Sequence, residues 1–314
     1  MPLTATDEII APAYARNRGV GAFNVVQLEH AEAIVEGAER AKLPVILQIS
    51  ENTVRYHGSL APIGRAALAL AEQATVPVAL HLDHAESEDL VHEAVRLGFT
   101  SVMFDASALP YALNVAATRA VTDFGHRADV FVEAELGEVG GKNGAHAPGV
   151  RTDPQEAREF AEATAVDCLA VAVGSSHAMA TRDAVLDFDL IARLRTSAGV
   201  PLVLHGSSGV SDADLAKAVA AGMTKVNVST HLNGIFSATV RRELDRRPEV
   251  SDSRTYIGPA REEVAAEVAR LLGVLAGAPH PGRATAAPLT TVVRTDDGPI
   301  TGAVDPAPST REYS

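Results

Sequence analysis

Eight short apolar runs, each bounded by turn-forming residues, constrain the fold of this chain more than any other feature. Between them lie segments in which apolar residues recur at helical spacing. A regular succession of strand and helix sets parallel strands side by side, and eight such units close into a barrel. The sequence therefore predicts an α/β protein with a (β/α)₈ fold, the TIM barrel. The predicted strands are 20–25, 45–50, 78–83, 101–105, 130–136, 168–174, 202–205 and 225–229, and the predicted helices include 28–42, 63–74, 87–97, 154–164, 188–196 and 212–220.

An open, doubly wound sheet is the main alternative to a barrel. It would require a glycine-rich phosphate loop after the first strand, and residues 23–27, Phe-Asn-Val-Val-Gln, contain no glycine. A further helix is predicted over 259–276. Beyond it the composition shifts to Ala, Pro, Thr, Gly and Asp, with too few apolar residues to offset the entropy of ordering. We therefore expect one barrel domain with an extra C-terminal helix, 1–276, followed by a flexible tail, 277–314.

The composition excludes several classes of partner. Of the 314 residues 46% are hydrophobic, enough for one large core, and the formal net charge is −13. Nucleic acids and anionic membranes bind clustered lysine and arginine, so neither is an expected partner. The sequence has no membrane-span-length apolar run and no signal-peptide pattern at the N-terminus. The one cysteine, Cys168, excludes an intrachain disulfide and is expected to be a buried thiol, so we expect a cytoplasmic protein.

Polar side chains gather where the predicted strands end. In a (β/α)₈ barrel the active site lies at the carboxyl ends of the strands. Three histidines, His84, His177 and His205, follow the third, sixth and seventh strands and are suited to converge on one metal ion. A three-histidine set with an open position is the usual catalytic zinc arrangement. The other polar residues at these ends are Asn24, Ser50, Asp83, Asp105, Glu133, Glu135, Asn227, Ser229 and Thr230.

The remaining histidines are not expected to bind metal. His81 lies two residues before Asp83 and so points to the same face of the strand, as a core residue or a support for the ligands. Five others lie on or beside predicted helices or in the tail and are expected to be solvated or locally hydrogen-bonded: His30, His92, His126, His231 and His280.

Five blocks of the sequence carry a family resemblance. One reads Val-Pro-Val-Ala-Leu-His-Leu-Asp-His at 76–84, and a second reads Val-Glu-Ala-Glu-Leu-Gly at 132–137, followed by Gly140 and Gly141. Together with three later blocks, they resemble the signatures of the class II (zinc-dependent) fructose-bisphosphate or ketose-bisphosphate aldolase family. The resemblance is collinear from about Thr4 to Leu272, so only the tail is uncovered. The later blocks are 170–177, 201–209 and 224–230.

The resemblance implies a reaction and a metal centre. The reaction is reversible cleavage between C3 and C4 of a ketose 1,6-bisphosphate, of the fructose or tagatose type, into dihydroxyacetone phosphate and an aldehyde phosphate such as glyceraldehyde 3-phosphate. His84, His177 and His205 match the family's Zn²⁺ ligands, and a divalent cation stabilises the enediolate as a Lewis acid. Asp83 matches the acid/base that exchanges a proton with the C4 hydroxyl. The carboxylates of Asp105 and Glu135 match residues with one of two roles. They either form a second cation site, for a divalent or monovalent ion, or orient the metal ligands.

Substrate contacts also follow from the resemblance. Asn227 matches the side chain that hydrogen-bonds the enediolate. Backbone groups and hydroxyls of small residues would cradle the phosphate next to the ketone, which lets an acidic protein bind an anion locally. Asn24 and Ser50 match positions near the distal half of the substrate, and Arg254 and Arg261 are the candidates for its distal phosphate. The family also implies a role in glycolysis and a homodimer or homotetramer. The cradle residues are Gly174, Gly206, Ser208, Ser229 and Thr230.

The sequence departs from the family pattern at three places. The loop after Gly141 usually carries an acidic pair, one member of which helps proton transfer at C3, but here it has Asn143; His146 or a water would take that role. Ser229 replaces the acidic or amide side chain of many fructose-preferring members and is as small as the residue in tagatose-type relatives. The run that begins at Ser50 and the loop that we expect up to residue 58 also differ from the commonest family pattern. This segment would suit another group at the distal end of the substrate.

Several alternatives stay open after these departures. The chain could be an aldolase for another phosphorylated keto sugar or keto-deoxy acid, or a catalytically weak sugar-phosphate binding protein that keeps the metal. An epimerase needs a second acid/base on the opposite substrate face, and only Asp83 is well placed. A Schiff-base aldolase is disfavoured, because Lys42 and Lys217 fall on helices, Lys142 lies in a loop, and Lys225 opens the eighth strand at the end of the barrel away from the site.

Overall fold

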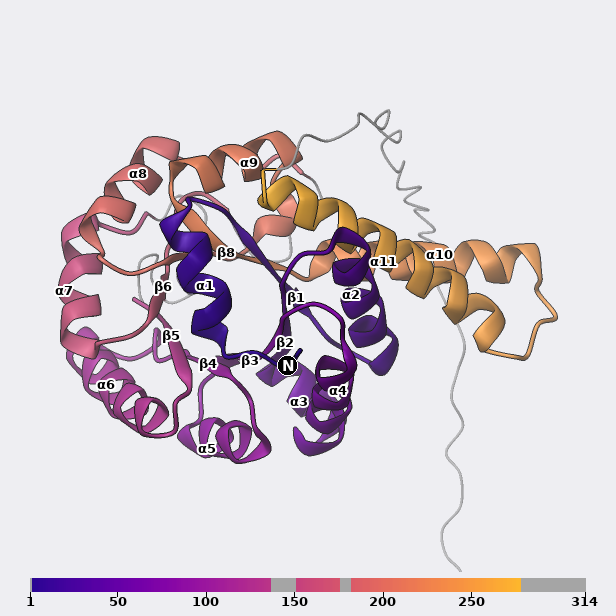
Figure 1. Ribbon diagram of the computed structural model, residues 1–314, viewed down its shortest axis with the longest axis horizontal. Coiled ribbons are helices and arrows are strands. Elements are labelled where there is room, and N and C mark those ends of the chain that lie inside the picture. The colour runs from indigo at the N-terminus through magenta and orange to yellow at the C-terminus, as the bar shows by residue number, and fades with distance from the viewer. Residues whose placement is uncertain (1, 137–150, 176–181, 278–314) are drawn as a thin grey trace, which may run out of the picture. The chain divides into compact units, whose positions relative to one another are not determined.

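The computed structural model describes residues 2–136, 151–175 and 182–277. Within these ranges eight parallel strands close into a barrel in chain order, because β1 pairs with β2 on one side and with β8 on the other. Figure 1 looks down the barrel and shows helices as an outer ring around the strands. The predicted (β/α)₈ fold is confirmed. The strands are β1 (Val20–Asn24), β2 (Val45–Ser50), β3 (Val78–Ala85), β4 (Ser101–Phe104), β5 (Phe131–Glu135), β6 (Cys168–Ala170), β7 (Leu202–Leu204) and β8 (Met223–Val228).

The six helices predicted between strands begin and end within two residues of their predicted bounds. Four others were not among the predicted ones: α1 (Thr6–Ala15), α3 (Glu51–His57), α6 (Tyr111–Arg127) and α10 (Thr230–Arg246). The remaining helices are α2 (Leu28–Ala41), α4 (Ala61–Gln73), α5 (Glu88–Leu97), α7 (Pro154–Thr164), α8 (Phe188–Ser197), α9 (Asp212–Ala221) and α11 (Arg254–Leu275), with a short 3₁₀ turn, η1, at Ser207–Gly209.

The segment after Ser50 was expected to be a loop, and this prediction is wrong. It forms helix α3, because the Ser50 side chain caps the helix by accepting a hydrogen bond from the Thr53 amide at 3.3 Å. Gly58, with φ of 74°, ends the helix in the left-handed conformation that glycine adopts at no steric cost. These local signals outweigh the β-branched residues inside the helix.

Helix α11 begins five residues before its predicted start, so that Pro259 lies inside it. A proline cannot donate to the carbonyl four residues earlier, which here is that of Thr255. Arg247 of the preceding segment donates to that carbonyl at 3.0 Å instead. The lost helical bond is thus replaced, and the helix continues through the proline.

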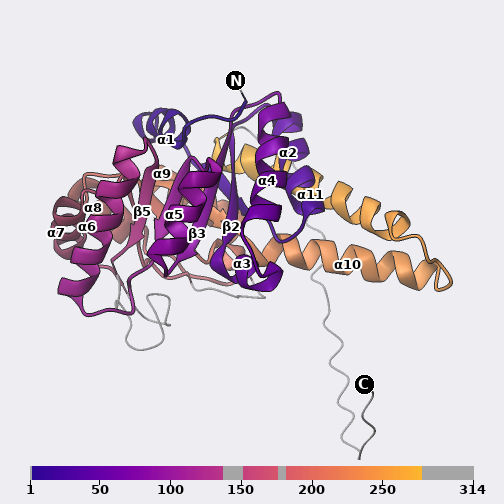
Figure 2. The same ribbon diagram turned by 90° about the horizontal axis from the view of Figure 1, so that it is seen from below.

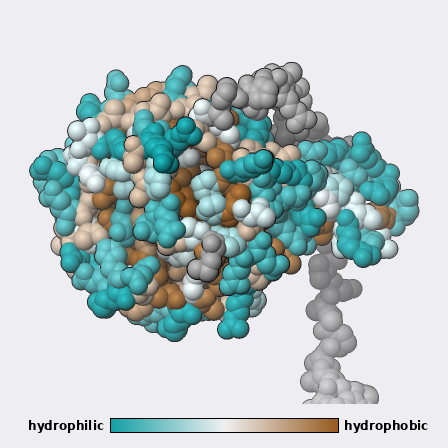
Figure 3. Space-filling view, in the orientation of Figure 1, coloured by the Kyte–Doolittle hydropathy of each residue, from teal (hydrophilic) through white to brown (hydrophobic). Residues whose placement is uncertain are grey.

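Helix α1 closes the amino-terminal end of the barrel. Its Ile9 and Ile10 pack on inward-facing residues of the first strands, among them Ala22, Ile46 and Ala79. Figure 2 shows α1 at one end of the strands and α3 at the other. On the face drawn in Figure 3, which α1 crosses, hydrophilic side chains cover the outer helices and apolar ones appear toward the centre. The opposite end of the barrel is therefore the one left open for a site.

The strands are buried on both faces, as expected for a parallel sheet covered by helices. Cys168 is buried, in agreement with the prediction. His30 was expected to be solvated or locally hydrogen-bonded, but it is 4% exposed, and neither ring nitrogen has a hydrogen-bond partner among the described residues. That prediction is wrong, because His30 faces the seam between α2 and α10, where its ring packs 4.9 Å from that of Phe236.

The described residues end with α11 and the two residues after it. Across the described ranges, no helix is long and apolar enough to cross a membrane. Residues 278–314 lie outside the described part of the chain, so the flexible tail and the domain boundary at 276 stay predictions.

Candidate functional site

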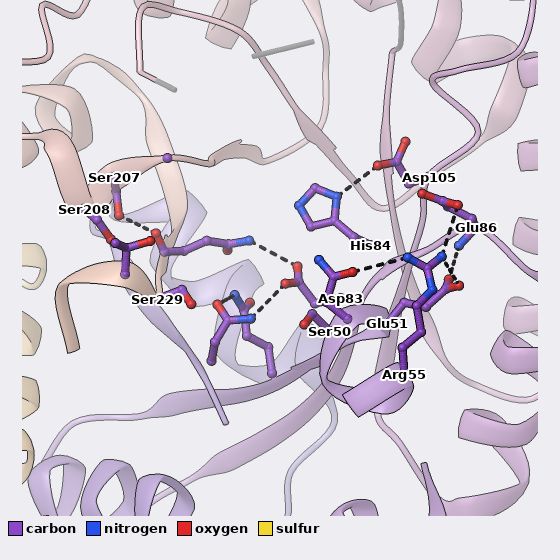
Figure 4. Close-up of a pocket in the computed structure, with 16 residues that line it drawn as sticks. Ser50, Glu51, Arg55, Asp83, His84, Glu86, Asp105, Ser207, Ser208 and Ser229 are labelled. Atoms are coloured by element: carbon purple, nitrogen blue, oxygen red, sulfur yellow. Dashed lines mark hydrogen bonds and ion pairs between the residues drawn. The ribbon is translucent and has the colours of Figure 1, made fainter. Parts of the chain in front are cut away.

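A cavity of about 380 Å³ opens at the carboxyl ends of the strands. Figure 4 shows Ser207, Ser208 and Ser229 on one side of it and Glu51, Arg55 and Glu86 on the other, with Asp83 and His84 between them. The cavity thus has two polar ends joined by a centre that carries a carboxylate and an imidazole. Its lining residues are Asn24, Gln48, Ser50, Glu51, Asn52, Arg55, Asp83, His84, Glu86, Asp105, Gly206, Ser207, Ser208, Asn227, Ser229 and Thr230.

Asp83 and His84 both reach the cavity although they are consecutive residues of β3. Consecutive side chains of a regular strand point to opposite faces. Here the register of β3 against β4 shifts between Leu82 and Ala85, and His84 has a φ of 49°. A bulge of this kind redirects one side chain and is typical of strand ends near active sites. The backbone of this turn therefore presents a carboxylate and an imidazole side by side.

Asp105, directly after β4, holds the imidazole of His84. Its Oδ2 lies 2.9 Å from His84 Nδ1, and its Oδ1 accepts from the amide of Ser107 at 3.1 Å. Burial opposes a charge on His84, but Asp83 and the hydrogen bond with Asp105 raise the pKa of the imidazole to about 10. Burial likewise opposes the charge on Asp105, yet the hydrogen bond from His84 lowers the pKa of that carboxyl. Because Asp105 occupies Nδ1, it is Nε2 of His84 that can reach into the cavity.

His205, Glu135 and His84 form a cluster that could hold a metal ion. One ligand atom from each lies within 4.8 Å of the others. His205 is fully buried at the end of β7, its Nδ1 is 3.6 Å from Glu135 Oε2, and its ring centroid is 4.8 Å from that of His84. Imidazole nitrogens and a carboxylate oxygen are ligands that suit zinc. The donor set therefore fits the metal that the sequence predicts.

Parts of the predicted site fall outside the described residues. His177, the third predicted histidine ligand, is one of them, and so are Asn143 and His146 in the loop after β5. Their roles stay predictions. Asp105 is described and bonds the ring of His84, but whether it orients a ligand or belongs to a second cation position also stays a prediction.

Two amides hold the carboxylate of Asp83, which is only 3% exposed. Asn24 donates to its Oδ2 at 3.0 Å, and Asn227 lies 3.5 Å from its Oδ1. Gln48 in turn donates to Asn24 at 2.7 Å, which fixes the amide of Asn24 with its NH₂ group toward Asp83. Asn24, predicted near the distal half of the substrate, thus contacts the predicted acid/base directly.

Small residues shape one end of the cavity. Gly206 has a φ of 64°, and Ser208 accepts a hydrogen bond from the His231 amide at 3.1 Å. Ser229 and Thr230 stand at the start of α10, where backbone N–H groups and the helix dipole favour an anion. Four of the five predicted cradle residues therefore line this end. Gly174 is not among the described residues that line the cavity.

The opposite end carries charged residues of α3 and the β3–α5 loop. Arg55 bonds Glu51 at 2.6 Å and Glu86 at 3.3 Å. Of the two arginines that the sequence suggested for a distal phosphate, Arg254 pairs with Asp252 and Arg261 with Glu32, and neither is among the lining residues that the structure describes. Sequence reasoning missed Arg55; a helical reading of the segment would have paired it with Glu51 four residues earlier.

The side chain of Lys225 does not lie where the sequence suggested. It was expected at the end of the barrel away from the site, but its side chain runs through the interior to Glu133 at 2.7 Å and Asn227 at 2.9 Å. Burial opposes ionisation of Glu133, yet Lys225 lowers the pKa of this carboxyl. His81 lies beside the same carboxylate, at 3.7 Å, and bonds Ser101 at 2.9 Å.

Comparisons with known proteins agree with this geometry. The family model described as class-II fructose-bisphosphate aldolase matches residues 4–278. The chain is 44% identical over 269 residues to a protein of Bacillus subtilis (strain 168) named probable fructose-bisphosphate aldolase, a match that covers 84% of this chain and 94% of the relative. It is 41% identical to the fructose-bisphosphate aldolase of Staphylococcus aureus (strain Mu50), with the same coverage.

A solved structure resembles the whole barrel. The crystal structure of the YdjI aldolase from Escherichia coli K12 superposes with a TM-score of 0.77 at 32% sequence identity. The match covers 88% of this chain and 100% of the YdjI aldolase chain. The likeness thus extends across the elements that carry the cavity.

Proposed function

Because the chain belongs to the class II fructose-bisphosphate aldolase family, and is therefore a lyase of the aldolase type, we propose that it reversibly cleaves the C3–C4 bond of a ketose 1,6-bisphosphate. The products are dihydroxyacetone phosphate and an aldehyde phosphate such as glyceraldehyde 3-phosphate. The observation that carries the proposal is the bulge of β3, which sets Asp83 beside His84 between the two polar ends of the cavity.

We propose Zn²⁺ as the metal, bound by His84, His177 and His205. The nearness of His84 and His205 supports this assignment, and Glu135 in the same cluster suits a second or alternative cation position. The bound ion supplies Lewis-acid stabilisation of negative charge on the carbonyl oxygen of the substrate. Asp105 holds the His84 ring in the orientation that this requires.

Asp83 exchanges the proton of the C4 hydroxyl. As the C3–C4 bond breaks, this hydroxyl becomes the aldehyde of one product and its proton passes to Asp83, while the electron pair of the bond passes to the other product. Asn24 holds the carboxylate in place. The NH₂ group of Asn227 faces the same space and donates to the developing enediolate.

The serine-rich end of the cavity binds the phosphate next to the ketone. Gly206, Ser208, Ser229 and Thr230 offer backbone N–H groups and hydroxyls at the start of α10. Such a cradle binds an anion without a positive side chain, which suits a protein of net charge −13. The substrate then extends past Asp83 toward Ser50 and Arg55.

Both ends of the cavity bear on which substrate is cleaved, and the distal end would hold the second phosphate. Arg55 brings a guanidinium there, but two carboxylates already hold it. Ser229 is small, as in tagatose-type members of the family, so we keep fructose and tagatose bisphosphates as equal candidates. An aldolase for another phosphorylated keto sugar or a keto-deoxy acid is the alternative.

A substrate panel tests these assignments. Purified, zinc-loaded protein is given fructose 1,6-bisphosphate, its C4 epimer tagatose 1,6-bisphosphate, a ketose 1-phosphate with an uncharged end and a keto-deoxy acid phosphate, and triose phosphate is followed by coupled NADH oxidation. We expect cleavage of at least one bisphosphate. Turnover of the uncharged or acidic substrate alone would assign the alternative, and binding without turnover would point to a sugar-phosphate binding protein.

We further propose that the enzyme works in the cytoplasm as a homodimer or homotetramer and takes part in glycolysis. The single buried cysteine and the family support this setting. Light scattering of the purified protein gives the oligomeric state directly.

A further inference from the structure

A lysine and a glutamate form an ion pair inside the barrel, just below the cavity. Lys225 is 1% exposed and Glu133 is fully buried, and their charged groups lie 2.7 Å apart. Such a pair adds little stability over apolar residues of the same volume, because both charges must be desolvated. Its position under the cavity therefore calls for another explanation.

One contact of the pair leads to the metal cluster. Glu133 Oε1 lies 3.0 Å from Nε2 of His205. A carboxylate can only accept, so Nε2 must carry the proton. The neutral ring then has its lone pair on Nδ1, the nitrogen that faces Glu135. Ligand histidines in metal sites usually donate their other N–H to such a carboxylate, which fixes the tautomer and the ring orientation.

The other contact leads to the amide that faces the substrate. Lys225 Nζ lies 2.9 Å from Oδ1 of Asn227. An ammonium group can only donate, so the oxygen of the amide must face the lysine. The NH₂ group is thereby turned toward Asp83, where it can donate to negative charge. With a neutral amide in place of the lysine, only the long contact with Asp83, at 3.5 Å, would still favour this direction.

We propose that Lys225 and Glu133 form a positioning pair, which sets the tautomer of His205 and the direction of the Asn227 amide together. Each member compensates the buried charge of the other, and each also contacts one functional side chain, Glu133 that of His205 and Lys225 that of Asn227. The Asn227 part of this inference rests on the proposed aldolase function, whereas the His205 part needs only metal binding.

The test replaces both charged side chains of the pair with uncharged ones of similar volume. In Lys225→Met/Glu133→Gln both charges are gone, so neither is left buried alone, which would strongly destabilise the fold. Zinc affinity is measured by competition with a chromophoric chelator, and the ligand field is followed in the absorption spectrum of the Co²⁺-substituted protein. Thr164→Val is the control, because it removes a fully buried hydroxyl on α7 that bonds only within its own helix among the described residues.

We expect the double variant to melt cooperatively, to bind zinc about 10- to 100-fold more weakly and to show an altered Co²⁺ spectrum. We also expect kcat to fall at least about tenfold with KM little changed, since the Asn227 donor acts on charge that develops during the reaction. The control variant should match the wild type in zinc affinity, spectrum and kcat. Zinc affinity and kcat both within twofold of the wild type would overturn the proposal.

If the methionine variant does not fold, Lys225→Gln/Glu133→Gln takes its place. Two amides can hydrogen-bond each other, but each presents either an oxygen or an NH₂ group and so dictates no direction. The same losses are expected, and wild-type values would again overturn the proposal. Should the wild type cleave no ketose phosphate at all, the proposed function fails, while the zinc titration still decides the His205 part.

Discussion

His30 gives the chain a specific pH dependence of stability. The side chain is 4% exposed, and neither ring nitrogen has a hydrogen-bond partner among the described residues. Burial lowers the pKa of His30 from 6.5 to about 4. The folded protein therefore resists a proton that the unfolded chain accepts near pH 6.5. The stability linked to this difference is complete above pH 6.5 and is lost as the pH falls toward 4.

The size of the effect follows from the two pKa values. Each unit of difference is worth roughly 1.4 kcal/mol, so the full loss below pH 4 is about 3 kcal/mol. Between pH 7 and pH 5 the linkage relation gives a loss of about 2 kcal/mol in the free energy of unfolding. Other titrating groups add their own pH dependence, so the contribution of His30 must be measured as a difference between two proteins.

The assay compares the wild type with His30→Phe. Phenylalanine keeps a ring against Phe236, 4.9 Å away in the wild type, and cannot take a proton. Urea unfolding at pH 7 and pH 5, followed by circular dichroism, gives the free energy for both proteins. We expect the wild type to lose about 2 kcal/mol more than the variant on acidification. Equal losses in the two proteins would mean that His30 is protonated equally easily in the folded and the unfolded state, contrary to this prediction.

Three further predictions concern the site and its support. Asp83→Asn should lower kcat about 10²- to 10⁴-fold while zinc affinity changes little, since it removes a proton acceptor; steady-state kinetics and a zinc titration decide this. Asp105→Asn should weaken zinc binding about 10- to 100-fold, because it alters the hydrogen bond that orients a ligand histidine, and an unchanged zinc affinity would speak against that role. Gly174→Ala should destabilise the fold by about 2 kcal/mol or more, because φ is 122° and an added Cβ would lie 2.1 Å from the carbonyl oxygen of Val185; a melting temperature equal to that of the wild type would contradict the fit.

The fold could be predicted because its signals are local and repeated. Each strand is a short apolar run bounded by turn residues, and β2 (Val45–Ser50) occupies the predicted residues. Helix α3 was missed because Thr53 and Val54 weaken a helical pattern, and the helix is marked mainly at its ends, by the Ser50 cap and Gly58. Helix ends depend on such caps more than on composition.

The site could be predicted only in part. Strand ends identified Asp83, His84 and His205, since the topology brings these ends together whatever the details. The position of a residue in the sequence does not show which way a long side chain runs inside a barrel. The backbone of Lys225 lies in β8 away from the cavity, yet its ammonium group reaches Asn227. Residue spacing also does not predict that the consecutive residues Asp83 and His84 both face the cavity. The bulge at His84 makes this possible.

If a metal held beside Asp83 supports aldol cleavage, activity must depend on that metal. Release of triose phosphate from fructose and tagatose 1,6-bisphosphates is measured before chelation, after chelation and after zinc is added back. We expect that chelation abolishes cleavage, that zinc restores it, and that borohydride with substrate leaves the enzyme active because no lysine Schiff base forms. Cleavage that survives complete chelation, or that borohydride with substrate eliminates, would contradict this expectation.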